Sequence, residues 1–351
     1  LSGVPTDRRT LTSVLKDHIE RGAASGRFAG LVGAVVAGEE ILIEAARNAS
    51  AKPGSAAAPG PDTILEIGSV TKLFTALALS AQAHRRRVDL NQPVRSLLPP
   101  GVDVRSGAWH EASLQHLATH TSGLPRLPKG FFLRSLHRLD DPYADFEVPD
   151  LYASLSRTRL RSRPGTRFHY SNLGMGLLGH ALSRNEGVDY GELVGTLICA
   201  PLGLRDTGVS LAPDQEARFI QGHDRRGRAT GPWHIPALAG AGALLSTPSD
   251  LARFLQVQLA PDRAGAEGLE EAIRATQAER FSGRRTGVGL GWLISPFGTG
   301  GTLRWHNGRT GGYSAFLGMT SLAGVAVLAN SARSVDGIGT ELLRAVTEMS
   351  Q

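Results

Sequence analysis

The sequence predicts an α/β protein in which one β-sheet, completed by both chain ends and flanked by helices, carries an inserted, mainly helical lobe. Two observations support this prediction. Strand-like segments occur near both ends of the chain, and the middle, to about residue 260, contains several helical patterns. The 351 residues suffice for two lobes, and 41% hydrophobic content indicates an ordered globular protein. We expect one unit, with a sheet lobe at residues 1–80 and 280–351 and a helical lobe at 81–279.

The N-terminal elements follow from hydrophobic spacing. Leu11 to Gly22 has apolar residues at helical spacing and ends at a glycine, which predicts an amphipathic helix. Leu31 to Ala37 and Ile41 to Ala46 flank a Gly-Glu turn and predict a β-hairpin. Ala49 to Pro61 is rich in Ala, Pro, Gly and Ser, so we expect a surface loop. A strongly apolar helix is expected from Ser69 to Ala83.

The C-terminal part predicts a helix, several strands and a final helix. Thr247 stands at an N-cap position, with Pro248 next and Asp250 placed to reach back as in a capping box. The later segments expected to form successive strands and then a helix are Gly287–Ser295, Leu303–Arg309, Ser314–Thr320, Gly324–Ala329 and, as the helix, Val335–Met349.

Composition excludes several classes of protein. No apolar stretch approaches the length needed to cross a bilayer, so we expect no membrane span. The formal charge of +6 comes from scattered basic residues, and no nucleic-acid-binding module is present. Cys199 is the single cysteine, which leaves no internal disulfide. The chain begins at Leu1 without a basic-then-apolar leader, so a bacterial cytoplasmic and an exported location both stay open.

The first chemical motif is Ser69-Val70-Thr71-Lys72. Its serine and lysine are one helical turn apart, so both side chains can face one point. A hydroxyl becomes a nucleophile when a base takes its proton, and a lysine held neutral by burial is such a base, whereas an arginine is not. Ser13 and Lys16 repeat the spacing, but there we expect a surface lysine on an amphipathic helix. Ser69 differs because it opens an apolar helix, whose N-terminus stabilises a developing anion.

Two further motifs carry polar side chains next to glycines. Tyr170-Ser171-Asn172 leads into a helix; the tyrosine is a candidate proton shuttle and Asn172 a candidate partner for a substrate amide. The alternative is a buried tyrosine and an asparagine at a helix start. His306-Asn307-Gly308-Arg309 lies on a predicted strand, where Gly308 lets a substrate backbone approach. The backbone N–H groups of Ser69 and Arg309 are candidates for an oxyanion hole.

The order of these motifs resembles the three motifs of the serine β-lactamase and penicillin-binding-protein superfamily. The connecting segments are similar to the branch that holds class C β-lactamases, D-alanyl-D-alanine carboxypeptidases, D-aminopeptidases and related esterases. The resemblance covers about Phe28 to Asn330 and rests on three further segments: 117–124 (LATHTSGL), 201–207 (PLGLRDT) and 242–250 (GALLSTPSD). It implies an α/β fold with an antiparallel sheet, an inserted helical lobe, and an active site between them.

One departure bears on the substrate. Class C β-lactamases carry Lys-Thr-Gly as the third motif, whereas His306 holds the first position here. A weaker positive charge makes tight recognition of a β-lactam carboxylate unfavourable. Histidine at this position resembles the carboxypeptidases, aminopeptidases, esterases and several biosynthetic acyltransferases of the group.

We also expect a wall of the acyl pocket between Pro125 and Pro149. This irregular stretch carries several aromatic residues, of which Phe131 and Phe132 are our candidates for the wall. Packing of the same rings on the helical lobe is an equal alternative.

His116 and His120 have the i, i+4 spacing of a metal site, but the glutamate of a zinc-protease helix is missing, so we expect no metal and no other cofactor.

The sequence therefore predicts a serine acyl-transfer enzyme with Ser69, Lys72 and Tyr170 as catalytic residues. Asn172, His306, Gly308 and Arg309 are the expected substrate-binding residues. The leading hypothesis is hydrolysis of an ester or amide, of the esterase or D-peptidase type, with a small molecule or peptide as acyl donor. A transacylase or peptide-cyclising amide synthase with an amine acceptor is the alternative. A β-lactamase and a non-catalytic relative are less favoured, because the third motif begins with His306 and the catalytic residues are intact.

Overall fold

A single large antiparallel sheet forms the centre of the computed structural model, which describes residues 7–48, 59–131, 135–283 and 286–350. All of its neighbouring strands are antiparallel. In spatial order the strands are β2 (Glu40–Arg47), β1 (Gly30–Ala37), β12 (Ala323–Ala329), β11 (Ser314–Met319), β10 (Gly301–Arg309), β9 (Leu293–Phe297), β8 (Gly287–Val288) and β7 (Phe281–Ser282). The predicted α/β fold with an antiparallel sheet is confirmed.

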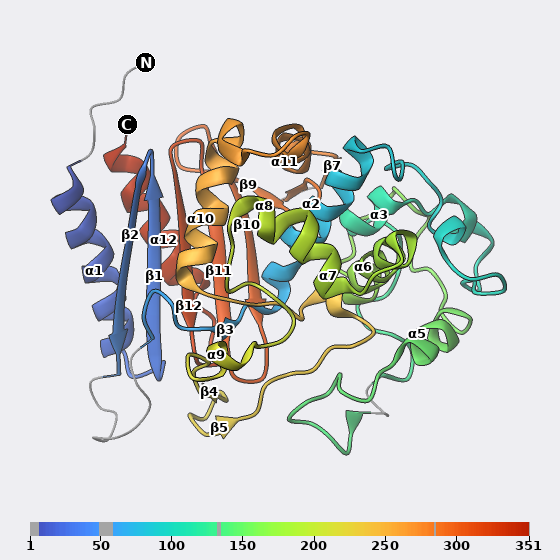
Figure 1. Cartoon of the computed structure of the whole chain (residues 1–351), viewed down its shortest axis with the longest axis horizontal. Helices are drawn as coiled ribbons and strands as arrows, with labels where there is room; N and C mark the ends of the chain where they lie inside the picture. The colour runs from blue at the N-terminus through green and yellow to red at the C-terminus, as the bar shows by residue number, and fades with distance from the viewer. Residues whose placement is uncertain (1–6, 49–58, 132–134, 284–285, 351) are drawn as a thin grey trace.

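Both ends of the chain complete this sheet. β1 pairs with β12 over seven positions, from Leu31 opposite Ala329 to Ala37 opposite Ala323. The blue N-terminal strands therefore lie beside the red C-terminal ones in Figure 1. On one face, α1 (Arg8–Ala24) and α12 (Asp336–Met349) pack together over an apolar layer to which α1 contributes Leu11, Leu15 and Ile19. The predicted N-terminal helix and hairpin are confirmed, each with slightly wider bounds.

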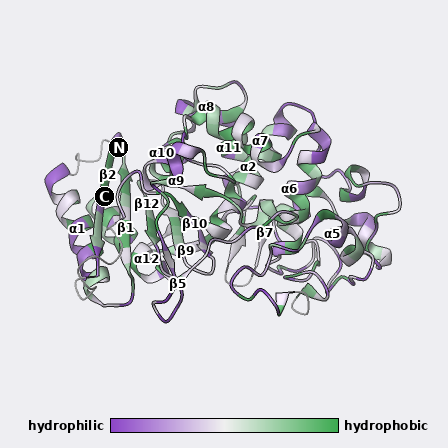
Figure 2. Ribbon diagram, turned by 60° about the horizontal axis from the view of Figure 1, so that its bottom comes forward, coloured by the Kyte–Doolittle hydropathy of each residue, from purple (hydrophilic) through white to green (hydrophobic). Residues whose placement is uncertain are grey.

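On the other face of the sheet, α10 (Pro248–Leu259) packs on β1 and β12, and α11 (Leu269–Gln277) packs on α2 (Thr71–His84). Twelve of the fourteen α2 residues are buried, since this helix runs between the sheet and the helical segments beyond it. Figure 2 shows the same arrangement, with apolar strands inside and polar helix surfaces outside. The remaining α-helices are α3 (Leu114–Ala118), α5 (Val148–Leu155), α6 (Asn172–Glu186), α7 (Tyr190–Val194), α8 (Ala200–Leu202) and α9 (Pro213–Glu216).

Short elements join these layers. The two-stranded sheets are β3 (Leu65–Glu66) with β6 (Leu245–Ser246), and β4 (Gly222–His223) with β5 (Ala229–Thr230). The single-turn helices are η1 (Gly68–Val70), η2 (Val94–Leu97), η3 (Gly107–Glu111), η4 (Gly195–Cys199), η5 (Ala239–Ala241) and η6 (Pro261–Ala264). β3 and η1 matter most for the site, because they lead the chain from the rim of the large sheet into α2.

The segment predicted as one strand from Gly287 to Ser295 is instead two strands joined by a tight turn. β8 ends at Val288 and β9 begins at Leu293. Gly291 in the turn has a φ of +76°, and a Cβ there would lie 3.0 Å from the Lys72 carbonyl oxygen. Leu290 and Trp292 are buried although they belong to the turn, so their apolar character gave the false impression of a continuous strand.

The prediction for the start of α10 is confirmed for its N-cap and wrong for its capping box. The Thr247 side chain accepts a hydrogen bond from the Asp250 backbone N–H, as predicted. The Asp250 carboxylate, however, accepts from Asp206 N at 2.8 Å and from Thr207 Oγ1 at 2.7 Å. It therefore fastens the segment after α8 to α10. Although α10 falls within residues 81–279, it packs on β1 and β12, and the division into two lobes stays a prediction.

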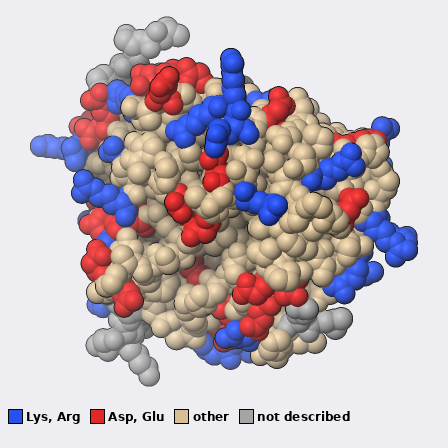
Figure 3. All heavy atoms as spheres, turned by 45° about the vertical axis from the view of Figure 1, so that its right-hand side comes forward, with Lys and Arg blue, Asp and Glu red and all other residues tan. Residues whose placement is uncertain are grey.

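In the described part of the chain, no helix combines the length and the apolar character needed to cross a membrane. On the face of the molecule seen in Figure 3, basic and acidic side chains are interspersed over the surface.

Candidate active site

Ser69 lies in η1, which is pressed against β10. Gly68, with a φ of +48°, approaches β10 so closely that a Cβ would lie 2.8 Å from Arg309 N. Gly308 approaches from the other side, and a Cβ there would overlap the Ile67 carbonyl oxygen and lie 3.0 Å from Ser69 N. Both positions therefore exclude a side chain. Their contact brings the backbone of Ser69 beside that of Arg309, where an oxyanion hole of these two N–H groups was predicted.

Lys72 lies one helical turn after Ser69 and is completely buried. Its Nζ is 2.8 Å from Ser69 Oγ and donates a hydrogen bond to the Ala241 carbonyl oxygen at 2.6 Å. Burial, with a smaller contribution from the nearby Arg126 guanidinium, lowers the pKa of Lys72 well below its ordinary value. A lysine in this state has a free electron pair to accept a proton from Ser69.

Tyr170, in the loop before α6, is the third predicted catalytic residue and lies beside Ser69 and Lys72. Its ring lies over Lys72, with Nζ 5.0 Å from the ring centroid, and its hydroxyl interacts with the Ser69 side chain. Burial raises the pKa of Tyr170, so the phenol stays protonated at neutral pH. His120 also packs on the Tyr170 ring, at 4.5 Å between centroids, and has a φ of 56°. Its Nδ1 accepts from Ser171 N at 3.2 Å and fixes the tyrosine loop.

His306 and Asn172 lie on two sides of this centre. The His306 ring is buried 6.0 Å from the Tyr170 ring, and burial lowers its pKa to about 3, so the imidazole is neutral. Asn172, the first residue of α6, donates from Nδ2 to the Tyr143 hydroxyl at 3.3 Å. Its buried Oδ1 has no hydrogen-bond partner among the described residues. An unpaired amide oxygen next to a nucleophile is well placed to accept from a substrate N–H.

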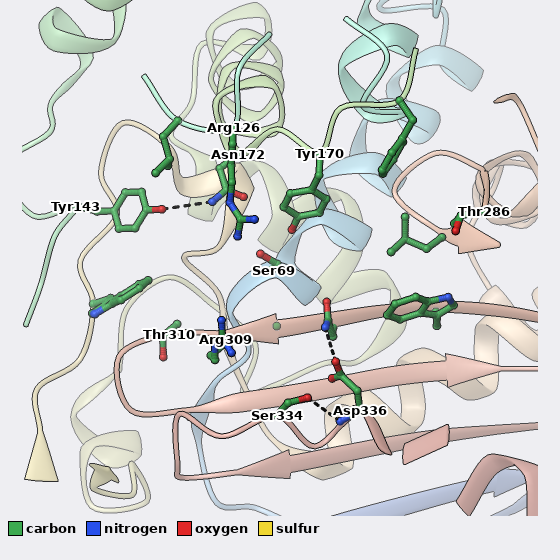
Figure 4. Close-up of a pocket in the computed structure, with 17 residues that line it drawn as sticks. Ser69, Arg126, Tyr143, Tyr170, Asn172, Thr286, Arg309, Thr310, Ser334 and Asp336 are labelled. Atoms are coloured by element: carbon green, nitrogen blue, oxygen red, sulfur yellow. Dashed lines mark hydrogen bonds between the residues drawn. The ribbon is translucent and has the colours of Figure 1, made fainter. Parts of the chain in front are cut away.

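The predicted residues meet in a cavity of about 670 Å³ (Figure 4). Ser69, Tyr170, Asn172, Gly308 and Arg309 all line it, whereas Lys72 and His306 lie behind the lining. Tyr143, one of the aromatic residues of the 125–149 segment expected to form a wall, also lines the cavity. Sequence reasoning missed several other lining residues: Arg126, Phe168, Trp233, Leu293, Trp305, Asn307 and Asp336. Arg126, Phe168 and Trp233 come from loops, whereas the others belong to β9, β10 and α12, and the position of all of them depends on the assembled fold. Alternation along β10 places the Asn307 side chain on the opposite face from His306.

Two loops meet to form one wall of the cavity. Trp233 lies against Tyr143, with 5.4 Å between ring centroids, and donates from Nε1 to the Asp140 carbonyl oxygen at 2.8 Å. Its backbone N–H donates to the buried carboxyl of Glu66 at 2.6 Å. Burial raises the pKa of Glu66 to about 7. Glu66 thus anchors the Trp233 loop of the wall. An acidic residue between apolar neighbours, three residues before Ser69, was the available sequence signal.

The expected wall residues have different positions. Phe131 is buried and packs on Tyr143 at 4.7 Å and on Phe146 at 5.7 Å between ring centroids. It does not line the cavity and instead supports Tyr143, which does. Phe132 lies outside the described residues.

The histidines with metal-site spacing serve other roles. His116 belongs to the capping box of α3, and His120 packs on Tyr170. Within the described ranges, no group of three or more His, Cys, Asp or Glu side chains is arranged to hold a metal ion.

Comparisons with known proteins identify the family of the chain. The model of the family described as Beta-lactamase matches residues 15–347. D-alanyl-D-alanine-carboxypeptidase/endopeptidase AmpH of Escherichia coli is 30% identical over 316 residues, which cover 86% of this chain and 78% of that protein. Esterase EstB of Burkholderia gladioli is 27% identical over 372 residues, covering 93% and 92%. A class C beta-lactamase structure superimposes with a TM-score of 0.83 at 20% identity and 98% coverage of both chains. The chain belongs to the beta-lactamase family, whose members are serine hydrolases.

Proposed function

We propose that the protein hydrolyses an ester or amide through an acyl-enzyme on Ser69. The observation that carries this proposal is the buried Lys72 amine, 2.8 Å from Ser69 Oγ and with a lowered pKa. Lys72 is the base, and not Tyr170, because burial favours the neutral form of both groups, and a neutral amine accepts a proton where a neutral phenol does not.

The reaction then runs in two halves. Lys72 takes the Ser69 proton while Oγ attacks the substrate carbonyl carbon, and the resulting oxyanion lies between the N–H groups of Ser69 and Arg309. The tetrahedral intermediate collapses, the bond to the leaving group breaks, and Tyr170 passes a proton to that group while Lys72 returns one to Tyr170. Water attacks the acyl-enzyme with the same groups in reverse order, which releases the acid and restores Ser69.

The substrate class is narrowed by the cavity. Its wall of Tyr143 and Trp233 offers apolar surface, and Asn172 Oδ1 offers an acceptor, a combination that suits an acyl group with an apolar part and an N–H. The names of AmpH and EstB point to peptides and esters as alternatives of the same chemistry. The neutral His306 disfavours a β-lactam, whose carboxylate needs a positive partner.

Intact-protein mass spectrometry tests the nucleophile. The protein is exposed to a p-nitrophenyl ester, and we expect a mass increase of one acyl group, mapped by peptide digestion to Ser69. Ser69→Ala should lose both the adduct and turnover, whereas Ser13→Ala, which alters the other Ser-x-x-Lys sequence, should keep both. An adduct on Ser13, or turnover that survives in Ser69→Ala, would refute the assignment.

The same experiment separates hydrolysis from transfer to an amine. With the acyl-enzyme formed, adding D-alanine amide or hydroxylamine should change the product ratio only slightly if water is the natural acceptor. A product that is mostly amide at millimolar amine would instead assign the transacylase alternative.

A further inference from the structure

The cavity has an uneven distribution of charge. Lys72 and His306 lie behind its lining, and burial lowers the pKa of both groups. Among the described lining residues the charged side chains are Arg126, Arg309 and Asp336. Arg126 lies over the Tyr170 ring, with Cζ 5.5 Å from the centroid. In Figure 4, Asp336 lies on the far side of β10 from Tyr170 and Arg126. One boundary of the cavity is therefore basic and another acidic.

Asp336 is held in place by rigid elements. Its Oδ2 accepts a hydrogen bond from Asn307 Nδ2 at 2.7 Å, and its backbone N–H donates to Ser334 Oγ at 3.2 Å. It is the first residue of α12, and Asn307 lies in β10 opposite Phe316 of β11. Both of these partners are uncharged, so neither hydrogen bond pairs the half-buried Asp336 with a cation.

The site geometry decides which part of a substrate meets this carboxylate. Tyr170 protonates the leaving group in the proposed mechanism, so the leaving group lies beside Tyr170. Tyr170, Asn307 and Asp336 line the same cavity, although Asn307 and His306 point to opposite faces of β10. β9 pairs with β10 only as far as Trp305, so within the described residues no β9 residue pairs with β10 at Asn307. Asn172 is bonded to Tyr143 and so belongs to the wall with Trp233. The acyl part therefore extends along Tyr143 and Trp233, and the leaving group extends over Asn307 towards Asp336.

We propose that Asp336 selects the leaving group, favouring one that carries a cationic ammonium group and rejecting one that carries a free carboxylate. For a neutral leaving group we expect a kcat/KM between those of the cationic and the anionic one. Trp305 and Leu293, which also line the cavity, supply apolar contact for the carbon skeleton of such a group. A carboxylate in the same place would face the Asp336 carboxylate, and like charges in a partly desolvated site repel. This inference rests on the proposed function for the direction of the leaving group.

Three thioesters with the same phenylacetyl group test the proposal. Their thiols are thiocholine, its uncharged carbon analogue 3,3-dimethylbutanethiol, and 3-mercaptopropionate. In each reaction the Ser69 Oγ–acyl bond forms, the acyl–sulfur bond breaks, and the thiol leaves with the proton from Tyr170. The rate of thiol release gives kcat/KM at constant ionic strength.

We expect the thiocholine ester to exceed the carboxylate ester by at least about tenfold in the unaltered protein. In Asp336→Asn, which keeps the shape and an acceptor for Asn307, this ratio should fall by at least about fivefold. Glu341→Gln removes an exposed charge from the same helix outside the cavity and should keep the original ratio. An unchanged ratio in Asp336→Asn, or a carboxylate ester that reacts fastest in the unaltered protein, overturns the proposal.

A binding measurement separates this inference from the proposed function. The same thioesters are titrated into Ser69→Ala and followed by tryptophan fluorescence, since Trp305 and Trp233 line the cavity. If the charge preference appears in Ser69→Ala and vanishes in Ser69→Ala with Asp336→Asn, the selection by Asp336 holds even where the acyl-enzyme does not form. If acylation of Ser69 is observed without any charge preference in binding or rate, the proposed function holds and the inference about Asp336 fails.

Discussion

Lys72 Nζ lies between the Ser69 hydroxyl, 2.8 Å away, and the Ala241 carbonyl oxygen, 2.6 Å away, in a completely buried position. A neutral amine satisfies both neighbours at once, because it donates to the carbonyl and accepts from the hydroxyl. A charged ammonium ion would have to donate to both, and the nearby charge that acts on it, the Arg126 guanidinium, is also positive and does not balance it. The position therefore favours a proton acceptor.

Replacing Lys72 by arginine should remove this acceptor. Arg keeps a positive charge and does not lose its proton, so we expect Lys72→Arg to lower kcat/KM by at least ~10²-fold, the usual contribution of a general base. Steady-state hydrolysis of a p-nitrophenyl ester gives kcat/KM, and circular dichroism confirms that the variant folds. Lys16→Arg is the matched control, because that lysine follows Ser13 with the same spacing on exposed α1. Near-normal activity in Lys72→Arg would exclude Lys72 as the base.

The neutral state of His306 should make the protein a poor β-lactamase. Burial lowers its pKa to about 3, so it offers no positive charge to a β-lactam carboxylate at neutral pH. We expect slow nitrocefin turnover, while slow acylation of Ser69 by a penicillin remains compatible with the site. Spectrophotometric turnover of nitrocefin measures the rate. A kcat/KM on the order of 10⁶ M⁻¹s⁻¹, typical of efficient enzymes, would restore the β-lactamase function.

Glu66 should make stability depend on pH. Its pKa rises from 4.5 to about 7 on folding, chiefly through burial, while the charges of Asp141 and His234 act in opposite directions on it. Between these values the unfolded chain has lost the proton and the native protein still holds it, so the contribution of Glu66 to stability falls as pH rises from about 4.5 to 7. The change is at most about 3 kcal/mol, from 1.36 kcal/mol per pKa unit.

Glu66→Gln should remove this dependence and still accept the Trp233 N–H. Urea unfolding at pH 5 and pH 8 compares the variant with the unaltered protein. We expect the variant to become relatively more stable at pH 8, and Glu341→Gln, on the surface of α12, to show no such trend. A difference between Glu66→Gln and the unaltered protein that stays constant with pH would show that Glu66 is already ionised in the native state.

Much of the fold and of the catalytic centre was predictable from sequence because local patterns specify them. Continuous apolar runs specified β1 and β12, which are buried on both faces, and the spacing of Ser69 and Lys72 follows from one helical turn. Other features depend on contacts between distant residues. The hydrogen bond that joins two loops links Trp233 to Asp140, 93 positions away, and the one that joins β10 to α12 links Asn307 to Asp336, 29 positions away. No local pattern encodes such contacts, and for that reason Arg126 and Asp336, two of the three charged residues that line the cavity, were missed.

The last prediction concerns Phe131, which lies behind Tyr143 and not in the cavity itself. If a fixed position of Tyr143 is needed to orient the acyl group, shortening the Phe131 side chain that packs on it should alter KM as well as stability. We expect Phe131→Leu to lower the melting temperature and to raise KM severalfold, and to increase the share of acyl-enzyme lost to water where an amine competes. Phe254→Leu is the matched control, since Phe254 is equally buried and stacks on Phe74 at 4.5 Å, away from the cavity lining. That control should lower the melting temperature with unchanged kinetic constants. If Phe131→Leu behaves in the same way as Phe254→Leu, the ring serves packing alone, and Tyr143 keeps its place without it.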